Sequence, residues 1–335
     1  MTGIPGKLPP ELLEQYVLGR RGRVRPEVLV PAAFGEDAAV LDLDGRLCVV
    51  SVDPITGSAS EIGGLAVHVS CNDVAAHGAE PVAVLLCILV PPDQGAAAVN
   101  QIMAAAEQAA LDLDVQIAGG HTEMTPGLHQ PIVTATAIGA ARRGGYLTSA
   151  ALKPGHRLLM TKTAGLEGTA ILAWDYGDRL RASLGEETVA EGRSLAGSLS
   201  VVSEALLAAR SGAVAMHDAT EGGVYGAVWE MAAAAGVGVE IWPDRIPVAA
   251  STRQICETLN VDPFRLISSG VLLIGVPAAA ESSLVSSLTA AGHQVTAIGQ
   301  ALPAGAGCMI ASAAGRTVLE PPASDELWRI KGELG

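Results

Sequence analysis

Carboxylate side chains gather at the ends of apolar segments in the first half of this 335-residue sequence. They occur in 34–40, in 51–55 and in 71–79, and a fourth segment, 119–123, joins a glycine pair to a histidine and a glutamate. Carboxylate oxygens are ligands for a hard divalent cation, and glycines let an anion approach backbone N–H groups. The sequence has no P-loop motif, so these segments are the candidates for binding a cation and a phosphate chain.

The first two acidic segments are predicted to meet in a β-hairpin. A strand over 38–43, an Asp-Gly turn and a returning strand over 47–52 fit the hairpin pattern. In that register Glu36 faces Asp53, and Asp37 lies beside both. Facing like charges are destabilising, and a bound cation would relieve the repulsion. An open hairpin end in water is the alternative that this segment alone leaves open.

Asp73 falls on the apolar side of a predicted helix. Ser58 and Glu61 have the spacing of a capping box, and apolar residues then recur at helical spacing: Ile62, Leu65, Ala66, Val69 and Ala76. A carboxylate facing the core is costly unless it is paired, hydrogen-bonded or bound to a metal. A hydrogen bond to the backbone or to His77 is the alternative. Metal binding is the preferred interpretation, because two other acidic segments also lack evident partners.

Two glycine pairs follow predicted strands. The strand over 115–118 runs into Gly119-Gly120, and the strand over 213–216 runs into 217–223, which opens a second predicted helix. A glycine-rich turn from strand to helix suits an anion, because the first N–H groups are free and the helix dipole favours negative charge. A Gly-Gly pair alone commonly marks only a tight turn. Glu221 disfavours a bare phosphate at the second turn unless a cation bridges them.

Besides Asp73, two side chains are candidates for a direct part in catalysis. His121 follows the first glycine pair, where a ligand or proton-transfer role competes with that of a hydrogen-bonded structural histidine. Lys162 follows another predicted strand, where it could contact phosphate or substrate, or be a solvated loop lysine. The sequence leaves both alternatives open.

The order of these motifs resembles the aminoimidazole ribonucleotide (AIR) synthase superfamily. That superfamily holds AIR synthase (PurM), thiamine-monophosphate kinase, selenophosphate synthetase and the hydrogenase-maturation protein HypE. The matching motifs are Gly-Glu-Asp-Ala-Ala-Val at 35–40, Val-Asp at 52–53, Asn-Asp-Val-Ala-Ala-His-Gly-Ala-Glu-Pro at 72–81, Gly-Gly-His-Thr at 119–122 and His-Asp-Ala-Thr-Glu-Gly-Gly at 217–223. The last motif is most similar to the HypE-like, AIR synthase-related branch.

The resemblance implies ATP and Mg²⁺ as cofactors. The implied metal ligands are Asp37, Asp53 and Asp73, with Glu36 beside them. The implied nucleotide-binding residues are Asn72, Gly119, Gly120, Thr122, Asp218, Thr220, Gly222 and Gly223. The implied chemistry is activation of a substrate oxygen by ATP phosphorylation, or direct phosphoryl transfer, which needs positioning and charge neutralisation more than a protein nucleophile.

The resemblance also implies a fold. An α/β (α+β) chain of two domains is expected, with 1–150 as the ATP- and Mg²⁺-binding domain and 151–335 as an α/β sheet domain. The first domain is expected to form a β-barrel across a homodimer. Its Ala38–Val52 hairpin is too small to be stable alone.

Three departures from the family pattern bear on function. Glu36 stands where many relatives have aspartate, and Glu221 stands where HypE proteins carry arginine. HypE proteins end in a cysteine that is itself modified, whereas this sequence ends in Trp-Arg-Ile-Lys-Gly-Glu-Leu-Gly. The expected substrate is therefore an unidentified small molecule or a group on another protein. A small-molecule kinase or ligase, and a non-catalytic nucleotide-binding partner in hydrogenase maturation, are the alternatives.

Composition limits the partners and the location. The length allows two domains, with a break expected near 153–155. A net charge of −14 disfavours nucleic acid as a partner, and no uninterrupted apolar run is long enough to cross a membrane. Five cysteines without C-x-x-C spacing indicate free thiols in a reducing compartment. We expect a cytoplasmic protein.

Overall fold

The computed structural model describes residues 10–18, 20, 23–56, 61–141, 144–322 and 324–334. The chain forms two compact units. The N-terminal unit comprises Arg25–Pro31 and Asp37–Tyr146, and the C-terminal unit comprises Met1–Val24, Ala32–Glu36 and Leu147–Gly335. Ser58 of the expected capping box lies outside the described residues. None of the helices described is both long and apolar enough to cross a lipid bilayer.

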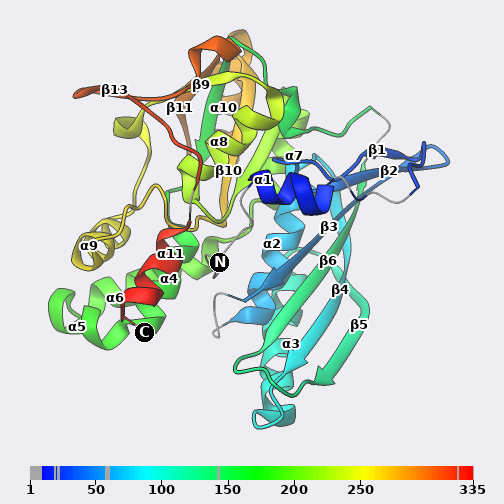
Figure 1. Ribbon diagram of the computed structural model, residues 1–335, viewed down its shortest axis with the longest axis vertical. Coiled ribbons are helices and arrows are strands. Elements are labelled where there is room, and N and C mark those ends of the chain that lie inside the picture. The colour runs from blue at the N-terminus through cyan, green and yellow to red at the C-terminus, as the bar shows by residue number, and fades with distance from the viewer. Residues whose placement is uncertain are drawn as a thin grey trace. The chain divides into compact units, whose positions relative to one another are not determined.

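The N-terminal unit is built on a six-stranded sheet in the order β1-β2-β3-β6-β4-β5 (Figure 1). Its strands are β1 (Val28–Val30), β2 (Ala39–Leu43), β3 (Arg46–Ile55), β4 (Glu80–Val90), β5 (Gln116–Met124) and β6 (Ile132–Ala141). Neighbouring strands are antiparallel except β4 and β5, which are parallel. The crossover between these two contains helix α3 (Gly95–Asp112).

The predicted hairpin is confirmed in its turn and register. Leu43 pairs with Arg46 across the Asp-Gly turn, and the ladder extends to the pair Ala39 and Val50. The ladder ends there, so the predicted pairing of Glu36 with Asp53 is wrong. β3 instead continues along β6, where Asp53 lies opposite Ala135.

Helix α2 (Ile62–Ala76) packs with α3 against one face of this sheet (Figure 1). The predicted single apolar stripe is too narrow, because 13 of the 15 residues of α2 are buried. Gly63 permits the close approach, since a Cβ there would lie 2.0 Å from the carbonyl oxygen of Ile102. The other face of the sheet exposes apolar side chains, including Val52 and Leu85.

The first glycine pair lies inside strand β5, so the prediction of a turn there is wrong. The strand bulges beside Ala118, where its pairing with β4 shifts register. Gly120 has φ of +146°, and a Cβ there would lie 1.9 Å from the carbonyl oxygen of Leu86. Only glycine fits this contact between the two strands.

The C-terminal unit has a seven-stranded sheet in the order β13-β12-β9-β11-β7-β10-β8. Its strands are β7 (His156–Thr161), β8 (Ala215–Ala219), β9 (Gly238–Ile241), β10 (Val271–Pro277), β11 (Val295–Leu302), β12 (Cys308–Ser312) and β13 (Gly315–Val318). Its helices are α1 (Pro10–Leu13), a π-helix (Glu14–Leu18), α4 (Leu166–Asp175), α5 (Gly177–Leu184), α6 (Glu186–Ser194), α7 (Val202–Arg210), α8 (Gly223–Ala235), α9 (Ala250–Leu259), α10 (Glu281–Ala290) and α11 (Glu326–Leu334). Short 3₁₀ segments occur at Ser149–Ala151, Leu195–Ser198, Pro243–Arg245, Ala278–Ala280 and Ala304–Ala306.

Two hydrophobic clusters stabilise this unit. One joins the sheet to α8 and includes Met160, Met231 and Leu273. The other joins α4, α9 and α11 through residues such as Ile255 and Leu327. α11 is therefore part of the core of this unit.

Residues 32–36 belong to the C-terminal unit for a physical reason. Phe34 packs edge-on against Trp229 with ring centroids 5.7 Å apart. The Glu36 carboxylate accepts the backbone N–H groups of Ser149 at 3.3 Å and Ala150 at 3.1 Å. Both carboxylate oxygens of Glu36 thus cap a 3₁₀ segment, a structural task that competes with the predicted metal binding.

Candidate functional site

Two of the predicted metal ligands meet across one hydroxyl group in the N-terminal unit. Ser51 and Asp53 are two residues apart on β3 and project to the same face of the sheet, whereas Asp73 comes from α2. The Ser51 Oγ contacts the Asp73 Oδ2 in a short hydrogen bond and lies 3.2 Å from the Asp53 Oδ2. Ser51 and Asp73 are each 6% exposed. The structure therefore brings Asp53 and Asp73 together around one buried hydroxyl group.

This carboxylate pair suits a hard cation. A serine hydroxyl has one proton, so it donates to only one of the two carboxylates at a time. Two neighbouring carboxylates repel each other, and a cation between them favours their charged forms. Mg²⁺ is commonly held by one or two carboxylates, with water and phosphate oxygens completing its octahedron.

Two further predicted metal ligands, Asp37 and Glu36, precede strand β2. Among the described residues, no group of three or more histidine, cysteine, aspartate or glutamate side chains is arranged to hold a metal ion. Asp37 is half-buried and precedes β2, and Glu36 caps the 3₁₀ segment already described. Asp53 and Asp73 are thus the pair that fits Mg²⁺ bound with its own water and phosphate ligands.

Residues beside Asp73 are held inside α2. Asn72 is fully buried, with 0% exposure. His77 is 1% exposed, and its Nδ1 lies 3.1 Å from the backbone carbonyl oxygen of Asp73. His77 therefore contacts the backbone of Asp73, while the Asp73 carboxylate is oriented by Ser51.

The candidate residues of β5 are all exposed on an edge strand. Gly119, Gly120, His121 and Thr122 lie in this strand, with β4 on its paired side. The His121 Nε2 lies 3.2 Å from the Glu123 carboxylate, and this contact lowers the pKa of Glu123. His121 is accessible for chemistry but is paired with its own strand neighbour.

Lys162 is tied into the C-terminal unit. Its Nζ donates to the backbone carbonyl oxygens of Ser200 at 2.6 Å and Gly270 at 2.9 Å, and to the carboxylate of Glu204. An ammonium group has three donors, so these acceptors satisfy all of them. This geometry favours a structural role for Lys162 over contact with phosphate.

The second glycine pair opens α8, as predicted, but its amides already have acceptors. Asp218 lies in β8 and is 2% exposed, and Thr220 follows that strand. The Gly223 N–H donates to the Thr220 carbonyl oxygen at 3.1 Å. The Gly222 N–H donates to the Asp325 carboxylate at 2.6 Å. An anion at this turn would meet a negative group of the protein itself.

Two buried acids near this turn have raised pKa values. Burial raises the pKa of Glu167 to about 7, against a hydrogen bond from Ser269 that lowers it. Burial likewise raises the pKa of Asp325 to about 7, although backbone N–H groups, including those of Leu327 and Gly222, lower it. The charge of Glu221 raises the pKa of both acids.

The sequence reasoning missed three of these residues. Ser51 could have been found by its i, i+2 spacing from Asp53 in a predicted strand. Glu167 could have been found as an acid in the apolar run 164–173. Asp325 carries no local signal, because its partner Gly222 is 103 positions away.

Comparison with known proteins gives a consistent set of similarities. Residues 35–141 match the N-terminal domain of AIR synthase related proteins, and residues 153–309 match the C-terminal domain. A putative hydrogenase expression/formation protein of Methanocaldococcus jannaschii is 26% identical over 341 residues, with 98% of each chain covered. The carbamoyl dehydratase HypE of Azotobacter vinelandii is 28% identical over 241 residues, covering 71% of this chain and 68% of that protein.

One solved structure has a similar fold. A hydrogenase maturation protein HypE in complex with ATP superposes with a TM-score of 0.74 at 21% identity. The match covers 97% of this chain and 98% of that one. At this identity the likeness is one of fold.

Proposed function

This chain belongs to the AIR synthase related family, and on that premise we propose that it is an ATP-dependent enzyme that phosphorylates an oxygen atom of its substrate. The observation that carries the proposal is the pair Asp53 and Asp73 bridged by Ser51. The similarity to carbamoyl dehydratase HypE and to a HypE solved with ATP supports it. Phosphoryl transfer needs this kind of site, since positioning and charge neutralisation supply most of its catalysis.

Asp53 and Asp73 would hold Mg²⁺ on the ATP phosphates. The bound ion would neutralise charge on the β- and γ-phosphates during transfer. Ser51 would orient the Asp73 carboxylate, because its hydroxyl donates to the Oδ2 of that residue. Asn72, beside Asp73 in α2, and Gly119 and Thr122 on β5 are further proposed contacts of the nucleotide.

The C-terminal unit offers a binding element of its own. We propose that Asp218 and Thr220 contribute polar groups to the nucleotide, at the turn that contains Gly222 and Gly223. Asp218 is on the buried end strand of its sheet, next to β10. The rigid position of this strand would give the contact its precision.

The proposed substrate class follows from the relatives named carbamoyl dehydratase. A carbamoyl oxygen would attack the γ-phosphorus of ATP, and the bond from that phosphorus to ADP would break. The C–O bond of the phosphorylated group would then break as the nitrogen loses its two protons. The products would be ADP, inorganic phosphate and a nitrile.

The carbamoyl group would be carried by a small molecule or by another protein. All five cysteines of this chain are free. Burial raises the pKa of Cys71 and of Cys256 to about 12, and it also raises the pKa of Cys48 and Cys308. Such thiols are poor nucleophiles, and we propose that none of these four is the acceptor. Free thiols also suit a cytoplasmic location.

The test is calorimetric titration with ATP and Mg²⁺. We expect wild type to bind with a rise in melting temperature, and Asp53→Asn or Asp73→Asn to weaken binding at least tenfold. Asp93→Asn is the matched control, since Asp93 is an exposed aspartate of the same unit. A flat wild-type titration, or equal binding by all variants, would contradict the proposal.

Turnover separates the enzyme from a nucleotide-binding partner protein. Wild type incubated with ATP, Mg²⁺ and a carbamoyl donor should release ADP and phosphate, and mass spectrometry should detect the nitrile. Phosphate retained on the product would indicate a kinase. Binding without ADP release in cell extract would indicate a non-catalytic partner in a maturation complex.

We also propose a homodimer formed through the open face of the N-terminal sheet. Val52 is 59% exposed and Leu85 is 38% exposed on this face, which is unusual for apolar side chains of a sheet interior. A second copy would cover them and close the β-barrel expected for this family. Light scattering should give twice the chain mass at micromolar concentration, and Val52→Lys should give the monomer. A monomeric wild type would contradict this.

A further inference from the structure

Asp325 joins two distant parts of the C-terminal unit. Its Oδ2 accepts the N–H of Gly222 at 2.6 Å, and its Oδ1 accepts the N–H of Leu327 at 2.8 Å. The side chain is 3% exposed. One buried carboxylate thus links the glycine turn before α8 to the first turn of α11.

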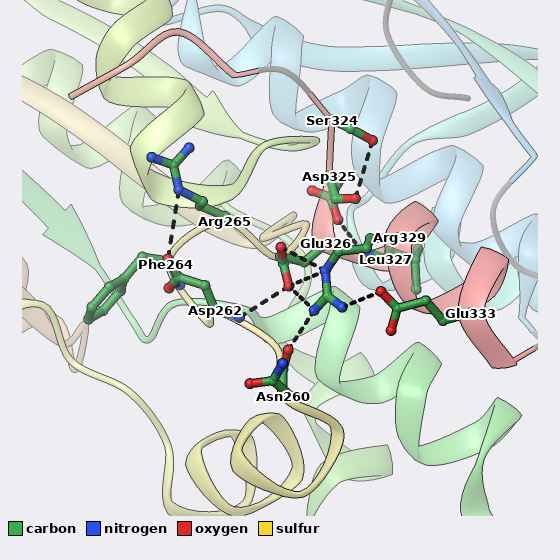
Figure 2. A network of polar contacts seen from close by, with 10 residues as sticks. All are labelled: Asn260, Asp262, Phe264, Arg265, Ser324, Asp325, Glu326, Leu327, Arg329 and Glu333. Atoms are coloured by element: carbon green, nitrogen blue, oxygen red, sulfur yellow. Dashed lines mark hydrogen bonds and ion pairs between the residues drawn. The ribbon is translucent and has the colours of Figure 1, made fainter. Parts of the chain in front are cut away.

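Helix α11 holds Asp325 in a fixed position. Leu327 and Ile330 are 1% and 2% exposed in the core cluster shared with α4 and α9. Figure 2 shows the guanidinium group of Arg329 between the carboxylates of Glu326 and Glu333 and the backbone of Asn260. A helix fixed by packing and by this polar network gives the carboxylate a defined place.

A second contact joins the same two segments. The Trp328 Nε1 donates to the Glu221 Oε1 at 3.3 Å. Consecutive residues of the turn, Glu221 and Gly222, are therefore both bound by the segment around the start of α11. The contacts have opposite polarity, since one uses a side-chain donor of α11 and the other uses the acceptor Asp325.

We propose that Asp325 is a positioning residue of the nucleotide site, a built-in hydrogen-bond acceptor that fixes the turn from Thr220 to Gly223. This proposal rests on the proposed function, in which Asp218 and Thr220 contact the nucleotide. The first N–H groups of a helix need acceptors, and here the chain supplies one itself. The turn is then ordered before ATP binds. ATP binding therefore does not include the entropy loss of ordering the turn.

The alternatives to positioning make different predictions. A plain helix cap would stabilise α11 without affecting ATP. A competing anion would block phosphate from the Gly222 N–H and weaken ATP binding. Positioning requires that removal of the carboxylate both loosens the turn and weakens binding.

The test compares Asp325→Ala and Asp325→Asn with Glu320→Gln, an acid-to-amide control at an exposed residue shortly before α11. Hydrogen exchange without nucleotide should become at least tenfold faster at residues 220–224 in Asp325→Ala and stay unchanged in the control. Calorimetry on the folded fraction should show Mg-ATP affinity lowered about tenfold or more. Asp325→Asn should fall between wild type and Asp325→Ala, because the amide oxygen keeps one acceptor.

Several outcomes would overturn the inference. Unchanged exchange at the turn would show that Asp325 does not fix it. Unchanged Mg-ATP affinity in Asp325→Ala would show that Asp325 acts only as a helix cap. Higher affinity would show that it competes with phosphate. Absence of Mg-ATP binding by wild type would instead refute the proposed function on which the positioning role rests. If Asp325→Ala does not fold, the same criteria apply to Asp325→Asn.

Discussion

The two glycine pairs of this chain, 119–120 and 222–223, look alike in sequence but perform different tasks. The first lies inside β5, where Gly120 is required by contact with the β4 backbone. The second opens α8, with φ of +86° at Gly222 and +63° at Gly223. A Gly-Gly pair after a strand therefore indicates a backbone constraint, and its partners decide whether that constraint concerns packing or a turn.

The largest expected effect tests the first pair. Gly120→Ala places a Cβ 1.9 Å from the Leu86 carbonyl oxygen, so β5 must move away from β4. We expect a loss of about 4 kcal/mol or more in the free energy of unfolding. Gly119→Ala is the matched control, since its nearest neighbour is the Leu85 side chain at 3.6 Å. That variant should cost about 1–2 kcal/mol through its φ alone. Urea unfolding gives both values, and equal costs would refute the packing role.

A second substitution pair tests the turn before α8. A Cβ on Gly223 would lie 2.6 Å from the carbonyl oxygen of Phe264 and 2.7 Å from that of Leu266. Gly223→Ala should therefore cost about 3 kcal/mol in the free energy of unfolding. A Cβ on Gly222 would lie 3.1 Å from the Cβ of Pro322. Gly222→Ala should therefore lower the free energy of unfolding by about half as much. The comparison of the two regions fails if neither substitution changes the urea midpoint.

A third prediction separates packing from ligand binding in the N-terminal unit. Ser51→Ala removes the hydroxyl between Asp53 and Asp73 while leaving both carboxylates. We expect Mg-ATP affinity to fall about three- to tenfold, or about 1 kcal/mol, with little change in melting temperature without ligand. Isothermal calorimetry measures the affinity, and Ser70→Ala, a buried serine of α2, serves as control. Equal losses in both variants would point to a general packing effect.

The last prediction concerns pH and belongs to the second region. The pKa of Glu167 rises from 4.5 to about 7 on burial, so the folded state binds more protons than the unfolded state between these values. This contribution to stability is complete below pH 4.5 and is lost as pH rises through 7, by up to about 1.4 kcal/mol per pH unit. Asp325 acts in the same direction from 3.8 to about 7.

Glu167→Gln isolates this contribution, because glutamine stays neutral. The unfolding free energy of the variant minus that of wild type should increase between pH 4.5 and pH 8. Glu187→Gln, an exposed acid of α6, is the control for charge loss. A difference that is constant with pH would show that Glu167 is ionised in the folded protein.

Local chemistry explains which parts of the fold were predictable. The register of the β2–β3 hairpin follows from its two-residue turn, and the opening of α8 follows from a glycine-rich strand-to-helix turn. The bulge beside Ala118 was unpredictable because it arises from the pairing of β5 with β4 across a helical crossover. Glu36 was misjudged because its acceptor role depends on Ser149, 113 positions away. Contacts at such separations leave no periodic pattern in the sequence.

Lys162 offers a practical probe of this molecule. Its ammonium group is held by three oxygen acceptors and its side chain is 23% exposed, whereas Lys153 in the same unit is exposed to solvent. An amine-reactive reagent should therefore modify Lys153 quickly and reach Lys162 only when the segment around Glu204 opens. The ratio of the two labelled peptides would measure how often this segment opens, in solution or in a cell extract, without any engineered tag.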